Sequence, residues 1–264
     1  MDSTLIFRFL CSLQAVSLAG SLAIHGSKTS SYLFLYWGLP EPLSIYVDYI
    51  VIAFLILAAI CVFLFKRIFL SFLIVGATAF AEALFYSAGG GGFASDWTLL
   101  SDLSRWAWPF LIIFCKYDFS SKLLLSPKLC RFLLGALAVT YCVHGMKAIY
   151  LNPGFLNLIY SFLVAIGSGD VRQDNIEYLL ISIGLLDVFV AISLIFFPSR
   201  LLLHWVVFWS LVTASSRTFL LGSLGLVELG LRAPHYLIPL ILLLEKVYKE
   251  PFKLVLSNKK TVDV

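Results

Sequence analysis

Apolar residues fill the chain in long runs that are separated by short polar connections. The strongest run, IVIAFLILAAICVFLF at residues 50–65, carries no charge, and with the residues before it can cross about 30 Å of hydrocarbon. Hydropathy predicts eight such spans, at residues 5–26, 47–65, 68–87, 103–115, 131–150, 176–197, 201–222 and 233–245, of which the fourth and last are short. Backbone amides at membrane depth need hydrogen-bond partners within their own segment, and no period-two alternation indicates a barrel. The sequence therefore predicts an all-α, polytopic transmembrane helical bundle.

Composition agrees with this prediction and restricts the function. Hydrophobic residues make up 61% of the chain and charged residues 13%, whereas a typical soluble domain has about 25% charged residues. The lipid bilayer is thus the expected surrounding. The net charge of +4 forms no basic stripe, so no nucleic-acid partner is expected. Arg8 interrupts the apolar N-terminal stretch, which is therefore interpreted as the first helix and not as a cleaved signal.

Lysine and arginine collect in alternate connections, which predicts the orientation. The connection SAGGGGFASDWTLLSD at 87–102 has no positive charge, whereas the next connection and the C-terminal tail are rich in lysine. The positive-inside rule therefore predicts that both termini are cytoplasmic. The membrane is expected to be the cell (inner) membrane.

The two halves of the chain resemble each other in the same order. RFLCSLQAVSLAGSLAIHGSK from Arg8 resembles RFLLGALAVTYCVHGMK from Arg131, and PFLIIFCK at 109–116 resembles PLILLLEK at 239–246. This pattern indicates a tandem duplication of a four-helix unit. Because each unit has an even number of helices, the two copies should be parallel. The predicted units are 1–118 and 131–247, joined by a cytoplasmic linker at 119–130 and followed by a cytoplasmic tail at 248–264.

The motif His-Gly-x-Lys occurs once in each half, as His25 to Lys28 and as His144 to Lys147. Equivalent positions of parallel repeats lie at equal membrane depth, so the two histidines are expected to meet at the outer side of a pseudo-twofold interface. The two lysines would then favour an anionic ligand or a quinone-type carbonyl. The alternative is a helix-end device, in which glycine ends the helix and lysine reaches the headgroups.

Ionisable residues inside predicted spans are further candidates, because such groups cost at least about 2.5 to 3.5 kcal/mol in hydrocarbon and normally face the bundle interior. Asp187 has Ala58 as its counterpart in the first half. Glu82 and Arg217 align with opposite charges, which predicts either an ion pair between the repeats or a ligand or proton site. Four residues near the outer ends of the fourth helices are interpreted mainly as interfacial anchors, with an outward-facing polar pocket as the alternative: Arg105, Glu228, Arg232 and His235.

Other chemistry finds little support in the sequence. The five cysteines include no C-x-x-C pair and the four histidines form no close pair, so neither a thiol centre nor a metal site is predicted. No nucleotide-binding loop occurs, and no catalytic residue is assigned. The cofactor is left unknown.

Each four-helix unit begins with arginine and ends its first helix in the HG.K motif. An aromatic, proline-containing connection follows (YLFLYWGLPEP at 32–42, IYLNPGFLNLIY at 149–160), and an acidic residue, Asp48 or Glu177, opens the next helix. This arrangement resembles the DoxX family, in a duplicated form. The resemblance implies a four-helix fold and an association with membrane-bound redox systems, sometimes as a small subunit beside a quinone-linked or thiol-handling enzyme.

Three functions follow. The favoured one is a non-catalytic accessory subunit of a membrane-associated redox or biosynthetic system, with a membrane or membrane-associated protein as its partner. The second is a transporter or lipid-binding or small-molecule-binding protein with a polar site between the repeats, whose ligand is a quinone, a lipid or a small anion. The third is a membrane enzyme with a site at the outer face built from His25, His144 and the neighbouring lysines.

Overall fold

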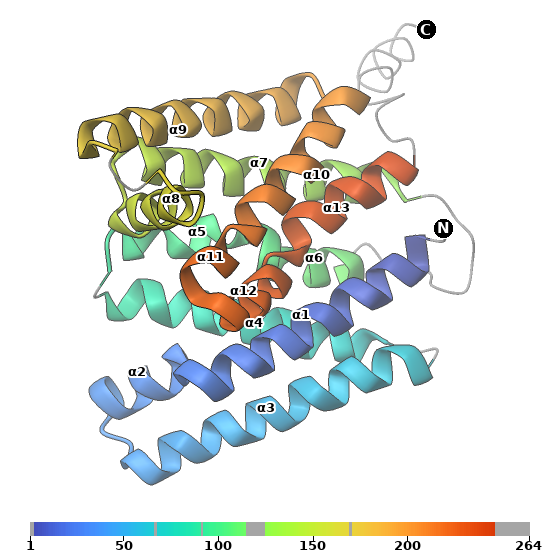
Figure 1. Cartoon of the computed structure of the whole chain (residues 1–264). Helices are drawn as coiled ribbons and strands as arrows, with labels where there is room; N and C mark the ends of the chain where they lie inside the picture. The colour runs from blue at the N-terminus through green and yellow to red at the C-terminus, as the bar shows by residue number, and fades with distance from the viewer. Residues whose placement is uncertain (1–2, 66–67, 91, 115–124, 169–170, 246–264) are drawn as a thin grey trace, which may run out of the picture.

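The computed structural model describes residues 3–65, 68–90, 92–114, 125–168 and 171–245, and these residues form helices and no strand (Figure 1). The helices are α1 (Ser3–His25), α2 (Lys28–Trp37), α3 (Glu41–Leu64), α4 (Phe69–Gly89), η1 (Ser95–Trp97), α5 (Thr98–Ser101), α6 (Leu103–Phe114), α7 (Pro127–Ile149), α8 (Pro153–Ala165), α9 (Gln173–Phe196), α10 (Arg200–Ser215), α11 (Arg217–Leu221), η2 (Gly222–Leu224), α12 (Gly225–Leu231) and α13 (Ala233–Leu244). Six segments of this described part are long and apolar enough to cross a membrane. The predicted all-α membrane bundle is confirmed.

Every predicted span falls on a helix, but the seventh is broken. Residues 201–222 were predicted as one span, whereas α10 ends at Ser215 and the short α11 follows. The hydroxyl groups of Thr213, Ser216 and Thr218 each donate to the carbonyl oxygen three residues earlier, and such bonds compete with regular helix geometry. Gly222, with φ +56°, follows the last residue of α11. The break directs the chain from α10 across the end of the bundle.

The two predicted connections between first and second spans are themselves helical. Ser27 caps α2 by accepting a hydrogen bond from the Ser30 amide, and Asn152 caps α8 by accepting one from the Gly154 amide. The linker predicted at 119–130 ends earlier than residue 130, because α7 begins at Pro127 after the capping residue Ser126. The remaining boundaries near 118, 119 and 247 lie outside the described residues.

Helix pairing repeats between the halves. In the first half α1 packs on α3 and α4 packs on α6, and in the second α7 packs on α9 and α10 packs on α13. The halves also exchange contacts in equivalent ways, since α1 packs on α12 and α13 while α7 packs on α5 and α6. Figure 1 shows α1 and α7 running in the same direction, with α2 and α8 at the same end of the bundle. This is the parallel arrangement that the duplication predicts.

The start of α6 is fixed by a buried polar contact with α1. The Gln14 side chain donates to the Arg105 carbonyl oxygen at 2.8 Å and accepts from the Trp108 indole N–H at 2.7 Å. Phe7 and Phe72 pack on the same indole, with ring centroids 6.1 and 5.3 Å from it. Because Gln14 is fully buried and both ends of its amide are bonded, these contacts hold the turn that carries Asp102 and Arg105 in place.

Glycines allow α7 and α9 to approach closely. A Cβ atom built on Gly145 would lie 2.6 Å from the Gly184 carbonyl oxygen, and one built on Gly184 would lie 2.6 Å from the Gly145 carbonyl oxygen. Small residues at helix crossings are the usual means by which membrane helices pack without a hydrophobic driving force. This contact sets the position of the helix that carries His144 and Lys147.

Replacing Gly145 by alanine should destabilise the protein by about 1 to 3 kcal/mol, because the methyl group forces α7 and α9 apart. Gly135→Ala on the same helix is the matched control, since a Cβ there meets nothing within 4 Å. That control should be neutral or more stable by up to about 1 kcal/mol. Thermal unfolding of the detergent-purified variants measures both. Equal stability of the two variants would contradict the close contact.

Reporter fusions test the predicted orientation. Fusions after Lys122 and in the C-terminal tail should report the cytoplasm, and a fusion after Ser95 should report the outside, because positive charge is retained inside. The start of α1 and the end of α13 lie on the same side of the bundle in Figure 1, which is required if both termini are cytoplasmic. Opposite locations for the Lys122 fusion and the tail fusion would exclude the parallel-repeat arrangement.

Candidate ligand-binding site

The bundle contains two adjoining cavities, one between its halves and one within the second half. The first, here called the polar chamber, has a volume of about 420 Å³ and is lined by residues of both halves. The second, the apolar chamber, has a volume of about 690 Å³ and lies within the second half. They share four lining residues, His144, Phe155, Arg217 and Arg232, which therefore form a common wall.

Charged side chains from both halves line the polar chamber. Five are cationic and three are carboxylates: Lys28, Arg105, Lys147, Arg217, Arg232, Glu82, Asp102 and Glu228. Most of them stand at helix ends, where short helices meet the long spans. The chamber thus holds an excess of two positive charges.

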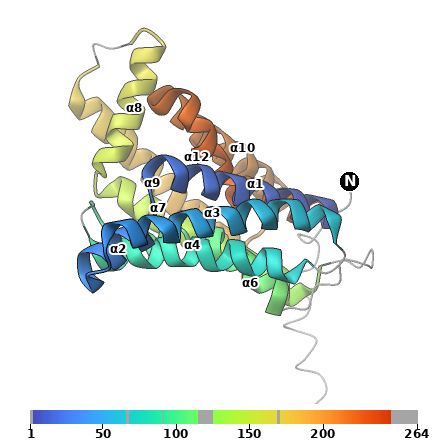
Figure 2. The ribbon, with the colours of Figure 1, turned by 90° about the horizontal axis from the view of Figure 1, so that it is seen from below.

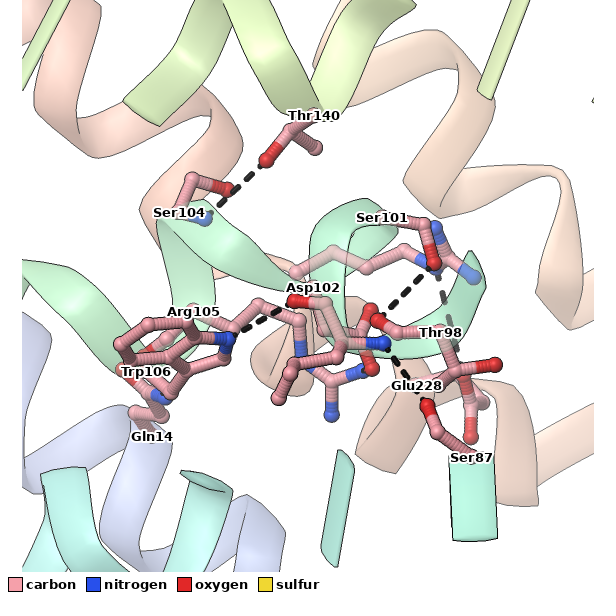
Figure 3. Close-up of polar contacts among 12 residues, drawn as sticks. Gln14, Ser87, Thr98, Ser101, Asp102, Ser104, Arg105, Trp106, Thr140 and Glu228 are labelled. Atoms are coloured by element: carbon pink, nitrogen blue, oxygen red, sulfur yellow. Dashed lines mark hydrogen bonds and ion pairs between the residues drawn. The ribbon is translucent and has the colours of Figure 1, made fainter. Parts of the chain in front are cut away.

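Two of the cations have carboxylate partners at the starts of the fourth helices. The Arg105 guanidinium lies 2.9 Å from the Asp102 carboxylate, and the Arg232 Nε lies 3.9 Å from the Glu228 carboxylate. Figure 3 shows Asp102, Arg105 and Glu228 close together beside the turn that carries Ser101. The same turn is tied to α7 by the Ser104 amide, which donates to the Thr140 hydroxyl at 3.0 Å. Each half of the bundle thus contributes one ion pair to the chamber, Arg105 with Asp102 and Arg232 with Glu228.

Glu82 is occupied by the first turn of α2. Its carboxylate accepts from the Lys28 amide at 2.8 Å and from the amide and hydroxyl of Thr29 at 3.3 and 2.9 Å. Free amides and the positive end of the helix dipole make this a favourable place for a carboxylate. The predicted ion pair between Glu82 and Arg217 is therefore not formed among the described residues, although both side chains line the polar chamber.

Three cations of the polar chamber form no ion pair among the described residues, and their direct contacts are to neutral groups. The Lys147 ammonium donates to the Ser101 hydroxyl at 3.1 Å, and the residue is 8% exposed. The Arg217 guanidinium lies 5.8 Å from the centroid of the Phe155 ring, and the Lys28 ammonium lies 5.4 Å from that of Tyr86. Cation–π contacts and hydroxyl groups hold these side chains without cancelling their charge.

His144 pairs with His235 and not with His25. The rings of His144 and His235 lie 6.0 Å apart, edge to face, and the Nε2 atoms of both are buried without a hydrogen-bond partner in the described part of the chain. His25 is exposed and lines neither chamber. The predicted meeting of His25 and His144 is wrong.

The reason lies in the backbone after each histidine. Gly26 adopts φ +70° and ends α1 directly after His25, and Asp48 holds the next turn by accepting from the amide and hydroxyl of Ser27. In the second half α7 continues through Gly145 to Ile149. The same motif is therefore a helix end in one copy and a helix interior in the other, and only the second copy brings its histidine inside.

The apolar chamber is walled by α7, α8, α9, α10 and α11. The side chains of Phe155, Ile159 and Phe162 from α8 and of Ile183 from α9 line it. The Phe162 and Phe219 rings meet edge to face at 5.3 Å where α8 contacts α11. None of the α8 residues is fully buried, and Figure 2 shows α8 projecting from the bundle. On this side of the chamber, α8 is thus the outermost helix.

Asp187 lies in the apolar chamber. Its carboxyl group accepts from the Trp209 indole N–H at 2.9 Å, and the residue is 8% exposed. It does not line the polar chamber. Asp187 is therefore an interior polar group apart from the cluster of cations.

Five of the seven predicted site residues line the polar chamber: Lys28, Glu82, His144, Lys147 and Arg217. The residues interpreted mainly as interfacial anchors, Arg105, Glu228, Arg232 and His235, line the same two chambers. The sequence repeat could have identified two of these residues as candidates for the site. Arg105 and His235 each stand four residues before an equivalent proline of the fourth helix, Pro109 or Pro239. Such equivalence places both near the interface of parallel repeats.

Within the described residues no group of three or more His, Cys, Asp or Glu side chains is placed to hold a metal ion. Comparisons of the chain with protein-family models, with curated proteins and with solved structures found no match.

Proposed function

We propose that this membrane protein binds an amphipathic anion of lipid type, with its charged headgroup in the polar chamber and its hydrocarbon tail in the apolar chamber. The observation that carries the proposal is the wall that both chambers share. Arg217 and Arg232 stand on that wall and line both cavities. A single ligand can therefore contact these guanidinium groups and extend into apolar space.

The electrostatics of the polar chamber favour an anion. Charges away from water interact more strongly than at a surface, and buried charges normally have a partner of opposite sign. Lys147 and Arg217 form no direct ion pair among the described residues, and their direct contacts are a hydroxyl group and an aromatic ring. A bound anion would supply the missing partner for both, and charge-assisted hydrogen bonds to arginine are among the strongest in proteins.

The apolar chamber supports a tail. Its volume of about 690 Å³ falls in the range of about 300 to 1,000 Å³ that is usual for small-molecule sites. Because α8 projects from the bundle, the contact between α8 and α11, where the Phe162 and Phe219 rings meet, is the proposed place of entry for a tail from the bilayer.

The accessory role implied by the DoxX resemblance stays a prediction, as do the inner-membrane location and the protein partner. Purification in mild detergent tests that role separately, since a stoichiometric protein partner supports it and its absence at native expression contradicts it. The binding site proposed here does not depend on that result.

Arg217→Gln should weaken retention of anionic phospholipid by about ten- to 150-fold, which corresponds to the loss of one charged hydrogen bond of about 1.5 to 3 kcal/mol. Arg172→Gln is the matched control, because the Arg172 side chain is 80% exposed and its ion pair in the described part of the chain is with Asp174. Native mass spectrometry of both variants in mixed anionic and zwitterionic lipid measures retention. Equal retention by both variants would exclude Arg217 from the headgroup site.

Ile183→Trp should fill part of the apolar chamber and reduce binding of long-chain anions while leaving short-chain analogues nearly unaffected. Leu185→Trp is the control on the same helix, because Leu185 is 59% exposed and does not line the chamber. The comparison uses one headgroup with chains of increasing length. A loss that is independent of chain length would show that the tail lies elsewhere.

A further inference from the structure

Resting on the proposed function, we infer that the headgroup is a phosphate monoester, the dianionic end group of a lipid phosphate, and not a diester or a carboxylate. The inference starts from the charges of the polar chamber, which are not balanced. Arg105 and Arg232 are matched by Asp102 and Glu228. Three cations and Glu82 remain, which leaves two positive charges.

A phosphate monoester matches this excess. It carries about −1.5 to −2 charges at pH 7 and three acceptor oxygens, whereas a diester or a carboxylate carries one negative charge. A monoanion would leave one cation of the chamber lining without a counter-charge, in a cavity where charges interact more strongly than at a free surface. Charge balance therefore selects the dianion.

The donors around the chamber suit several oxygens at once. Arg217 and Arg232 present planar forks of N–H groups, each with a buried Nε that has no hydrogen-bond partner among the described residues. Lys147 adds a point charge from α7. The buried Nε2 of His235, a residue 7% exposed, is a further unused group on the wall of the apolar chamber. Arg217, Arg232 and Lys147 thus line the polar chamber together, and His235 stands on the adjoining chamber that both arginines also line.

Two neighbouring features agree with this assignment. The first turn of α8, a helix of 13 residues, lines the polar chamber with Asn152, Gly154 and Phe155, so the positive end of its dipole adds to the field. Asp187, the carboxyl group of the apolar chamber, bonds to Trp209 and does not line the polar chamber. It therefore does not enter the charge balance at the headgroup.

The test compares two probes with the same tail, dodecyl phosphate and its methyl diester, on the purified protein in neutral detergent at pH 8. Dodecyl phosphate should bind at least about tenfold more tightly, because only it carries two charges. Lys147→Gln reduces the excess to one charge and should bring the two probes within about threefold of each other. Lys147→Arg keeps the charge and should keep the preference. Should Lys147→Gln fail to fold, Arg217→Gln makes the same change in charge.

Each result decides a different point. Equal binding of the two probes to the unaltered protein would overturn the monoester inference and leave the amphipathic-anion function standing. Binding of neither probe would overturn both. Inorganic phosphate bound as tightly as dodecyl phosphate would show a site for the free anion, which contradicts the lipid function. A preference that Lys147→Gln leaves unchanged would show that charge balance is not the cause.

Discussion

Positive charge enclosed between two apolar helical units is the constraint on which the rest of this structure depends. Arginine and lysine are costly at membrane depth unless they reach water or a partner. Here the partners come from equivalent places in the two halves, because Asp102 and Glu228 each belong to the segment directly before a fourth helix. Helix caps, the Gln14 contact and the close approach of α7 and α9 all serve to hold these turns at one level. The site is thus a consequence of how the halves meet.

The two halves share one pattern of helix packing and differ in the charged side chains that it carries. Glu82 and Arg217 occupy equivalent positions, yet Glu82 caps α2 while Arg217 lies over Phe155 and is left to face the chambers. The second half has a cation at this position, and its short helix α8 has Asn152 as its cap and, in the described part of the chain, no carboxylate on its first turn. One half therefore provides a tightly anchored short helix, and the other provides the wall of a cavity.

The sequence predicted the membrane bundle, and five of its seven candidate site residues line the polar chamber, since hydropathy and repetition depend on backbone geometry that many residues share. It failed where a single residue decided the outcome. Gly26 at positive φ ends α1, whereas the equivalent Gly145 lies inside α7 against Gly184, and the letters His-Gly-x-Lys do not distinguish these cases. Glu82 could not be assigned either, because its true partners are backbone amides of α2 and a hydroxyl. The cavities depend on side-chain packing between distant helices, which no local pattern records.

The outer wall of the apolar chamber is held less firmly than the helices behind it. No α8 residue is fully buried, whereas α7 and α9 are locked together where Gly145 meets Gly184. Under the proposed function, looser packing of the surrounding lipid would therefore shift α8 while α7 and α9 stay fixed. Membrane composition would then act on binding as a mechanical variable, separate from the concentration of the ligand.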